Sequence, residues 1–159
     1  MNIENAKAAL APYGLEGRIL EFSESSATVR EAAQALGCKP EHIAKTLAFS
    51  VRGKTVLIVA AGDARVDNKK YKMFFGAKAE MLRREETEAR TGYPCGAVCP
   101  FAPAAGTEIY LDESLRRFDT VYPAAGTASS AVRLTLPELE RVVRPVCWID
   151  VTKLPEEQA

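Results

Sequence analysis

The chain has 159 residues, which is enough for one domain of ordinary size and too few for two independent cores. Hydrophobic residues make up 47% and charged residues 26%, a composition that is typical of a globular protein and excludes a disordered chain. The 21 basic and 21 acidic side chains cancel. No overall field therefore attracts nucleic acid, and any RNA contact must come from a local patch of limited extent.

The N-terminal part of the chain predicts two helices with a short strand between them. Residues 2–13 have the apolar spacing of a helix, and residues 18–22 alternate like a short strand. Thr28 followed by Glu31 is the pattern of a capping box at the start of the second helix, which Gly37 ends.

A hairpin and a third helix are predicted next. Residues 43–51 and 55–61 are rich in apolar and β-forming side chains, and residues 52–54 supply the turn between them. Asp67 can cap a helix over residues 68–75.

The second half of the chain predicts short elements around a long loop, residues 92–107, which is rich in proline and glycine. Strands mixed irregularly with short helices indicate a single-domain α+β fold and not a doubly wound sheet. In chain order, the expected elements are a strand at 77–81, a helix at 83–90, strands at 108–111, 120–122 and 131–134, a helix at 136–143 and a strand at 146–149.

The termini and the cysteines exclude several classes of protein. Residues 1–5 lack the features of a signal peptide, and the longest apolar run, residues 56–61, is too short to cross a bilayer, so we expect a cytosolic protein without membrane contact. Cys95 and Cys99 are separated by three residues, where zinc knuckles have two. We therefore expect reduced thiols and no metal.

Lys45 is a charged residue inside an apolar strand. Strand alternation places it on the same face as Ile43 and Leu47. It is either a strand residue whose amine reaches water or a charge that lines a pocket, where it could bind a phosphate or carbonyl oxygen.

Two loops of small residues, 91–98 and 124–130, could let a ligand approach backbone N–H groups, although each is also an ordinary turn by its spacing. His42 is the only histidine, so a nucleophilic pair with Ser129 or Ser130 would require that residue to converge on them. The sequence therefore indicates no catalytic triad.

A basic cluster begins at residues 69–72 and includes Tyr71. Such a cluster is either a solvated helix face or a surface for a phosphate backbone beside a stacked base. The candidate RNA contacts are Lys69, Lys70 and Lys72.

In their order along the chain, these motifs resemble the YbaK/ProX family (YbaK/EbsC type) of trans-acting aminoacyl-tRNA deacylases, related to the editing domain inserted in bacterial prolyl-tRNA synthetases. The resemblance rests on residues 43–47, 67–78, 91–101 and 125–126. It extends over residues 1–152 as one editing domain and leaves 153–159 as a polar tail.

The resemblance implies a mixed, strongly curved β-sheet flanked by helices, with a pocket for the aminoacylated 3′ end of tRNA and no cofactor. The implied reaction is hydrolysis of a mischarged aminoacyl-tRNA, most simply tRNA for proline, with prolyl-tRNA synthetase as a candidate partner. Lys45 would hold substrate charge near the ester while water or a substrate group attacks. The implied substrate-binding residues are Thr46, Gly96, Ala97, Val98, Ala125, Gly126 and Thr127.

The chain departs from the cysteine-specific members of this family. Ala124 and Ala125 stand where those carry Ser-Gly, Ala131 stands where they carry an aspartate, and Ala97 replaces a glycine. Because methyl groups replace polar contacts, the sequence does not indicate cysteine as the amino acid removed. A non-catalytic module that binds aminoacyl-tRNA or a synthetase is the alternative, and a thiol or metal protein using Cys95 and Cys99 is a third.

Overall fold

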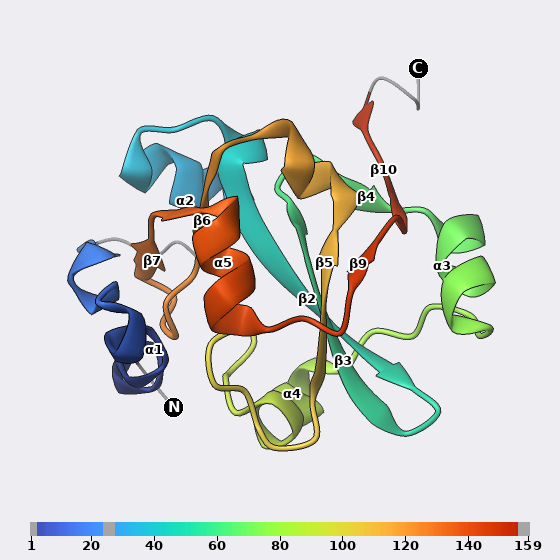
Figure 1. The fold of residues 1–159 in the computed structure, drawn as a ribbon. Helices are drawn as coiled ribbons and strands as arrows, with labels where there is room; N and C mark the ends of the chain where they lie inside the picture. The colour runs from blue at the N-terminus through green and yellow to red at the C-terminus, as the bar shows by residue number, and fades with distance from the viewer. Residues whose placement is uncertain (1–2, 24–27, 156–159) are drawn as a thin grey trace.

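The computed structural model describes residues 3–23 and 28–155. Its centre is a six-stranded mixed sheet (Figure 1). The strands are β2 (Ile43–Val51), β3 (Lys54–Ala61), β5 (Glu108–Asp112), β6 (Thr120–Pro123), β8 (Leu134–Thr135) and β9 (Trp148–Ile149), in the spatial order β8-β6-β2-β3-β5-β9. β2 pairs with β3 antiparallel and with β6 parallel, and β3 pairs with β5 parallel.

The long hairpin of β2 and β3 is confirmed and fixes the register of the sheet. Arg52 and Gly53 form its two-residue turn, with φ of 51° and 83°, as the mirror-image hairpin turns require. Lys54, expected in the turn, instead begins β3 opposite Val51. Because Val51 and Lys54 close a two-residue turn, odd-numbered residues of β2 exchange hydrogen bonds with β3 and even-numbered residues direct their peptide groups away from it.

Five α-helices surround this sheet within the described residues, and most begin or end where capping residues predict. Thr28 and Glu31 form the expected capping box, with Glu31 N donating to Thr28 Oγ1 at 3.1 Å. The helices are α1 (Ile3–Leu10), α2 (Val29–Leu36), α3 (Asn68–Phe75), α4 (Arg84–Thr91) and α5 (Leu136–Val143). Short 3₁₀ turns cover Ala11–Tyr13, Glu16–Arg18, Pro40–His42 and Glu113–Arg117.

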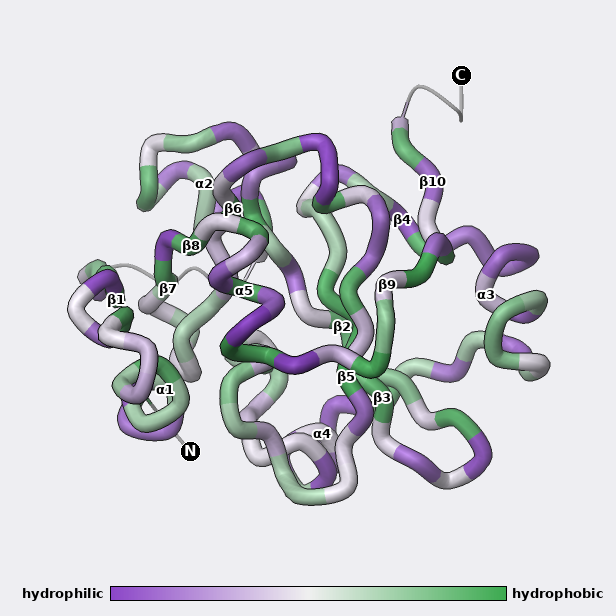
Figure 2. Tube along the Cα trace, in the orientation of Figure 1, coloured by the Kyte–Doolittle hydropathy of each residue, from purple (hydrophilic) through white to green (hydrophobic). Residues whose placement is uncertain are grey.

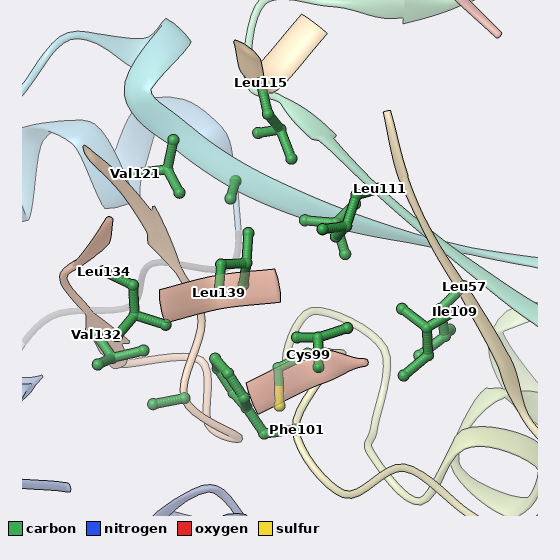
Figure 3. Packing of buried hydrophobic residues seen from close by; sticks show 14 of the residues in the cluster. Leu57, Cys99, Phe101, Ile109, Leu111, Leu115, Val121, Val132, Leu134 and Leu139 are labelled. Carbon is green, nitrogen blue, oxygen red and sulfur yellow. The ribbon is translucent and has the colours of Figure 1, made fainter. Parts of the chain in front are cut away.

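Each face of the sheet has its own core, and β3 is buried on both faces. Leu57 and Val59 of β3 face the larger core, which α5 covers through Leu139 (Figure 3). Ile58 faces a second core with Tyr71 of α3. Figure 2 shows the hydrophobic residues concentrated along the central strands. Because both faces are covered, β3 reads as a continuous apolar run.

Two expected strands differ from the structure. Residues 77–81 form no strand: only Met81 makes an isolated bridge, to Phe49. The strand expected over 131–134 is broken at Arg133, because β7 (Ser130–Val132) pairs with β1 (Ile19–Glu21) whereas Leu134 of β8 pairs with Val121. A change of partner at one residue leaves no mark in the alternation of side chains.

The sequence did not predict the small ribbon formed by β4 (Arg65–Val66) and β10 (Thr152–Lys153). Lys153 pairs with Arg65, and Leu154 packs against the larger core. Ordered chain therefore continues past the boundary at residue 152, and residues 156–159 lie outside the described range. Two-residue strands carry too little pattern to be recognised.

Candidate functional site

A cavity of about 300 Å³ lies at the edge of β2. Its walls come from segments far apart in the sequence: α2, β2, the chain around α4 and the connection from β6 to β7. Among the described lining residues, Lys45 is the one charged side chain and no histidine, aspartate or glutamate is present. The lining residues are Thr28, Val29, Ala32, Ile43, Ala44, Lys45, Thr46, Leu47, Ala48, Met81, Leu82, Thr87, Cys95, Gly96, Val98, Tyr122, Ala124, Ser130 and Ala131.

The cavity lies where the edge of β2 loses its neighbouring strand. Pairing with β6 ends at Ala44 opposite Pro123. The edge is covered again where Leu82 N donates to Ala48 O at 3.0 Å. Between these two points, within the described chain, no strand pairs with this edge of β2. A strand edge carries N–H and C=O groups that can bind a ligand, so this gap is part of the candidate site.

Lys45 is half-buried in the cavity wall. Its Nζ donates to Gly62 O at 3.2 Å and to Ala64 O. Burial lowers the pKa of the Lys45 ammonium, while Asp63 raises it and Arg65 lowers it further. An ammonium group has three N–H donors, so these two carbonyl groups orient the amine and leave one donor for a ligand.

Gly62 is required where the end of β3 approaches α2. A Cβ at this position would lie 2.0 Å from Pro40 O and 2.8 Å from Val29 Cγ1. The missing side chain lets the backbone of Gly62 lie against the wall formed by α2 and accept the Lys45 hydrogen bond. Sequence reasoning missed Gly62, because nothing in the local pattern distinguishes it from an ordinary turn residue.

Thr46 also lines the cavity, and its hydroxyl has no partner. Thr46 Oγ1 is buried and makes no hydrogen bond within the described part of the chain. As an even-numbered residue of β2, Thr46 also directs its peptide N–H and C=O toward the uncovered edge, as Ala48 and Ser50 do toward Leu82 and Glu80. A buried polar atom without a partner is rare in folded proteins and needs an explanation.

The loop after α4 forms another wall, and its own hydrogen bonds hold it in place. Thr91 Oγ1 donates to Thr87 O at 2.8 Å and accepts from Tyr93 N at 3.0 Å. The buried Tyr93 hydroxyl donates to Phe101 O. This frame presents Cys95, Gly96 and Val98 to the cavity, whereas Ala97 is buried outside the lining. Gly96 has φ of 92°, a backbone conformation that favours glycine over other residues.

The cysteines of this loop have different surroundings. Cys95 lines the cavity and is exposed, with Arg84 Nη1 at 3.7 Å from its sulfur. Cys99 lies in the larger core (Figure 3), where burial raises the pKa of its thiol to about 11. Cys99 is therefore a packing residue, and the two sulfurs do not share one environment.

The connection from β6 to β7 and the start of β7 contribute residues on either side of those expected from the sequence. Ala124, Ser130 and Ala131 line the cavity. Ala125 instead lies in the larger core, and neither Gly126 nor Thr127 is among the lining residues. Thr127 Oγ1 donates to Ser130 Oγ at 2.7 Å, so this pair shapes the loop behind the cavity wall.

His42 and the three candidate lysines lie outside the cavity. The ring of His42 packs edge-on against Phe118, with the ring centroids 4.4 Å apart. The Ser130 hydroxyl is hydrogen-bonded to Thr127. His42 and Ser130 therefore form no Ser–His pair. Lys69, Lys70 and Lys72 are on α3 and do not line the cavity. Lys70 is held by Asp150 Oδ1 at 3.1 Å and Thr152 O at 2.8 Å.

Several lining residues were missed because the fold alone brings them together. Leu82, Thr87 and Tyr122 are ordinary helix, strand or loop residues by sequence. Leu47 carried a signal, since it belongs to the strand motif around Lys45. Across the part of the chain that the structure describes, no helix is long and apolar enough to cross a membrane.

Comparisons with known proteins agree with this architecture. The profile of a family described as "Aminoacyl-tRNA editing domain" matches residues 23–142. A Bacillus subtilis protein, "Uncharacterized protein YwhH", is 45% identical over 154 residues, which are 96% of this chain and 98% of that one. The Enterococcus faecalis protein "Putative Cys-tRNA(Pro)/Cys-tRNA(Cys) deacylase EbsC" is 31% identical over 116 residues, 71% of this chain and 70% of the other.

The fold is shared with a solved structure described as "a putative trans-editing enzyme for prolyl tRNA synthetase". The two superpose with a TM-score of 0.84 at 28% identity, covering 95% of this chain and 96% of the other. The expected curved mixed sheet flanked by helices is thereby confirmed. The family profile covers most of the chain, including Lys45 and both loops, and the chain belongs to the aminoacyl-tRNA editing domain family.

Proposed function

We propose that this protein hydrolyses the ester between a wrong amino acid and the 3′ end of tRNA, acting in trans on tRNA for proline. The observation that carries the proposal is the cavity at the uncovered edge of β2, with the oriented amine of Lys45 in its wall. The names of the EbsC relative and of the structural neighbour support both the reaction and the tRNA. This activity fits a cytosolic location. Residues 1–152 form the proposed editing domain.

The reaction needs positioning more than proton transfer by the protein. Water adds to the acyl carbon, the bond from that carbon to the ribose oxygen breaks, and a proton of the water passes to that oxygen, which releases the free amino acid. The described cavity lining holds no histidine or carboxylate that could act as a general base. Lys45 keeps one N–H donor for the substrate, so its role is to hold negative charge near the ester.

A panel of tRNA substrates tests this function. Proline tRNA and one unrelated tRNA are each charged with alanine, serine, cysteine and proline, and the release of free amino acid is followed with and without the protein. Faster release of a wrong amino acid from proline tRNA, over many turnovers, is the expected result. The proposal fails if no charged tRNA is hydrolysed faster than in the protein-free reaction.

A non-catalytic module that binds aminoacyl-tRNA or prolyl-tRNA synthetase is the second candidate. It is favoured by the two carbonyl groups that already bind Lys45 and by the lack of a general base among the described lining residues. Tight binding of an uncleaved aminoacyl-tRNA would support this alternative. Repeated turnover in the same panel would exclude it.

A further inference from the structure

Thr46 presents three unused hydrogen-bonding groups at one point of the cavity wall. Its peptide N–H and C=O face the gap between Ala44 and Ala48, and its buried Oγ1 has no partner within the described residues. The gap corresponds to about 13 Å of strand. On either side of Thr46, Ala44 pairs with β6, and the carbonyl group of Ala48 accepts a hydrogen bond from Leu82 N.

An aminoacyl ester carries the groups that complete such an edge. In an antiparallel pair, two opposite residues exchange both of their N–H···O=C bonds. An esterified amino acid has an ammonium group that donates and an acyl oxygen that accepts, on either side of one α-carbon. It can therefore pair with a single strand residue as a neighbouring strand would.

We propose that the aminoacyl group binds as a one-residue strand against Thr46, its ammonium group donating to Thr46 C=O and its acyl oxygen accepting from Thr46 N–H. The Thr46 hydroxyl accepts a further N–H of the ammonium group. When water adds to the acyl carbon, the Thr46 N–H faces the oxygen that gains negative charge. This inference rests on the proposed function and identifies how the same site recognises its substrate.

The pairing also decides where the side chain of the amino acid lies. Residues directly opposite in an antiparallel pair point to the same face of the sheet. The side chain of Thr46 shares its face with Ala44 and Ala48, on the side of the larger core, where Leu82 and Val98 pack against that core and line the cavity. An L-amino acid with a small alkyl side chain fits this surface, and a D-amino acid would point to the opposite face.

Binding of adenosine analogues tests the pairing without requiring turnover. The probes are 3′-deoxyadenosines that carry L-alanyl, D-alanyl or propionyl groups through a 3′-amide, and calorimetry gives their Kd. The L-alanyl probe should bind about 10-fold to 100-fold more tightly than the propionyl probe, which lacks the ammonium group, and more tightly than the D-alanyl probe. Equal binding of all three, or binding of none, overturns the proposal whatever the hydrolysis panel shows.

Three changes at position 46 separate substrate binding from folding. Thr46→Val removes a buried hydroxyl that has no partner, so Tm should not fall, whereas the Kd for the L-alanyl probe should rise several-fold and Thr46→Ser should restore it. Replacing the Thr46 peptide N–H by an ester oxygen should raise that Kd about tenfold. The same replacement at Ser50, whose N–H donates to Glu80 O at 2.9 Å on the same edge, should leave the Kd unchanged.

An unchanged Kd for the L-alanyl probe in Thr46→Val and in the Thr46 ester variant would contradict the pairing. If Thr46→Val lowers Tm as well as weakening the binding of the L-alanyl probe, the hydroxyl supports the fold instead. Failure of the hydrolysis panel with selective binding of the L-alanyl probe would remove the enzyme activity and keep the recognition mode. The two proposals are therefore tested separately.

Discussion

Lys45 is oriented by backbone groups and not by an acidic side chain. Its amine donates to the carbonyl groups of Gly62 and Ala64, which carry no net charge. A carboxylate partner would cancel the charge that a substrate phosphate or acyl oxygen needs to meet. Backbone carbonyl groups fix the direction of the amine and leave its net charge in place.

The charge of Lys45 predicts an alkaline limit to activity. Burial is the main cause of the lowered pKa of Lys45, which lies below the 10.5 of an exposed lysine. The group is charged below its lowered pKa, and the enzymatic rate should fall as pH rises through that value. Single-turnover rates, corrected for spontaneous ester hydrolysis, measure this fall in rate at high pH. Lys45→Arg should remove the fall, because an arginine stays charged. If the fall persists unchanged in that variant, another group causes it.

Gly62 offers a second test at the scale of one residue. Gly62→Ala places a methyl group 2.0 Å from Pro40 O, so it should lower the free energy of unfolding by about 1–3 kcal/mol and reduce activity by displacing the acceptor of Lys45. Gly17→Ala is the matched control, because no atom lies within 4 Å of its added Cβ. Urea denaturation compares the two, and equal stability would show that the approach of Gly62 to Pro40 is loose.

At the scale of elements, α2 and α5 carry the same capping box in different surroundings. Thr28 begins α2, which lines the cavity, and Thr135 begins α5, which covers the larger core. Thr28→Ala and Thr135→Ala should each cost about 1 kcal/mol of stability. Deacylation rates should fall clearly more in Thr28→Ala. Equal rates in the two variants would exclude α2 as a wall of the working site.

The elements that the sequence predicted well are those whose ends carry their own chemistry. The boundaries of α3 follow from Asp67 at its start and Gly76 at its end, and the hairpin follows from two apolar runs around Arg52 and Gly53. Residues 77–81 have the alternation of a strand but no partner along most of their length. Arg133 is a corner only because Val132 and Leu134 have different partners.

The candidate site was predicted where a motif is continuous and missed where the fold assembles it. Lys45, Thr46, Gly96 and Val98 lie together in the cavity wall. The segment of residues 125–127 was expected there as well, but Ala124 before it and Ser130 after it line the cavity instead. Which residues of a loop face a cavity depends on packing from elsewhere in the chain, and a local sequence does not contain that information.

For the whole molecule, balanced charge implies a small RNA footprint. The 21 basic and 21 acidic residues cancel, and α3, on the far side of the sheet from α1 in Figure 1, carries the exposed Lys69 and Lys72. Neither lysine forms an ion pair within the described residues. They remain candidate tRNA contacts that do not reach the cavity.

Salt dependence tests this footprint. Lys69→Ala and Lys72→Ala should each weaken binding of intact tRNA and lower the slope of log Kd against log salt by roughly 0.7–0.9, while binding of a short aminoacyl-adenosine probe stays unchanged. Lys7→Ala on α1, where Lys7 pairs with Glu4 at 3.7 Å, is the control. Unchanged slopes in both α3 variants would place the tRNA on another surface.

We propose that the charge of Lys45 supports the hydrolysis of aminoacyl-tRNA in the cavity at the edge of β2. The most direct measurement is the single-turnover release of the preferred amino acid by the unmodified protein, by Lys45→Met and by Lys54→Met. Lys54 is an exposed lysine paired with Glu108 at the end of the hairpin. We expect a loss of about 100-fold in Lys45→Met and less than about twofold in Lys54→Met. A Lys45→Met protein that releases the amino acid as fast as the unmodified one would contradict the account.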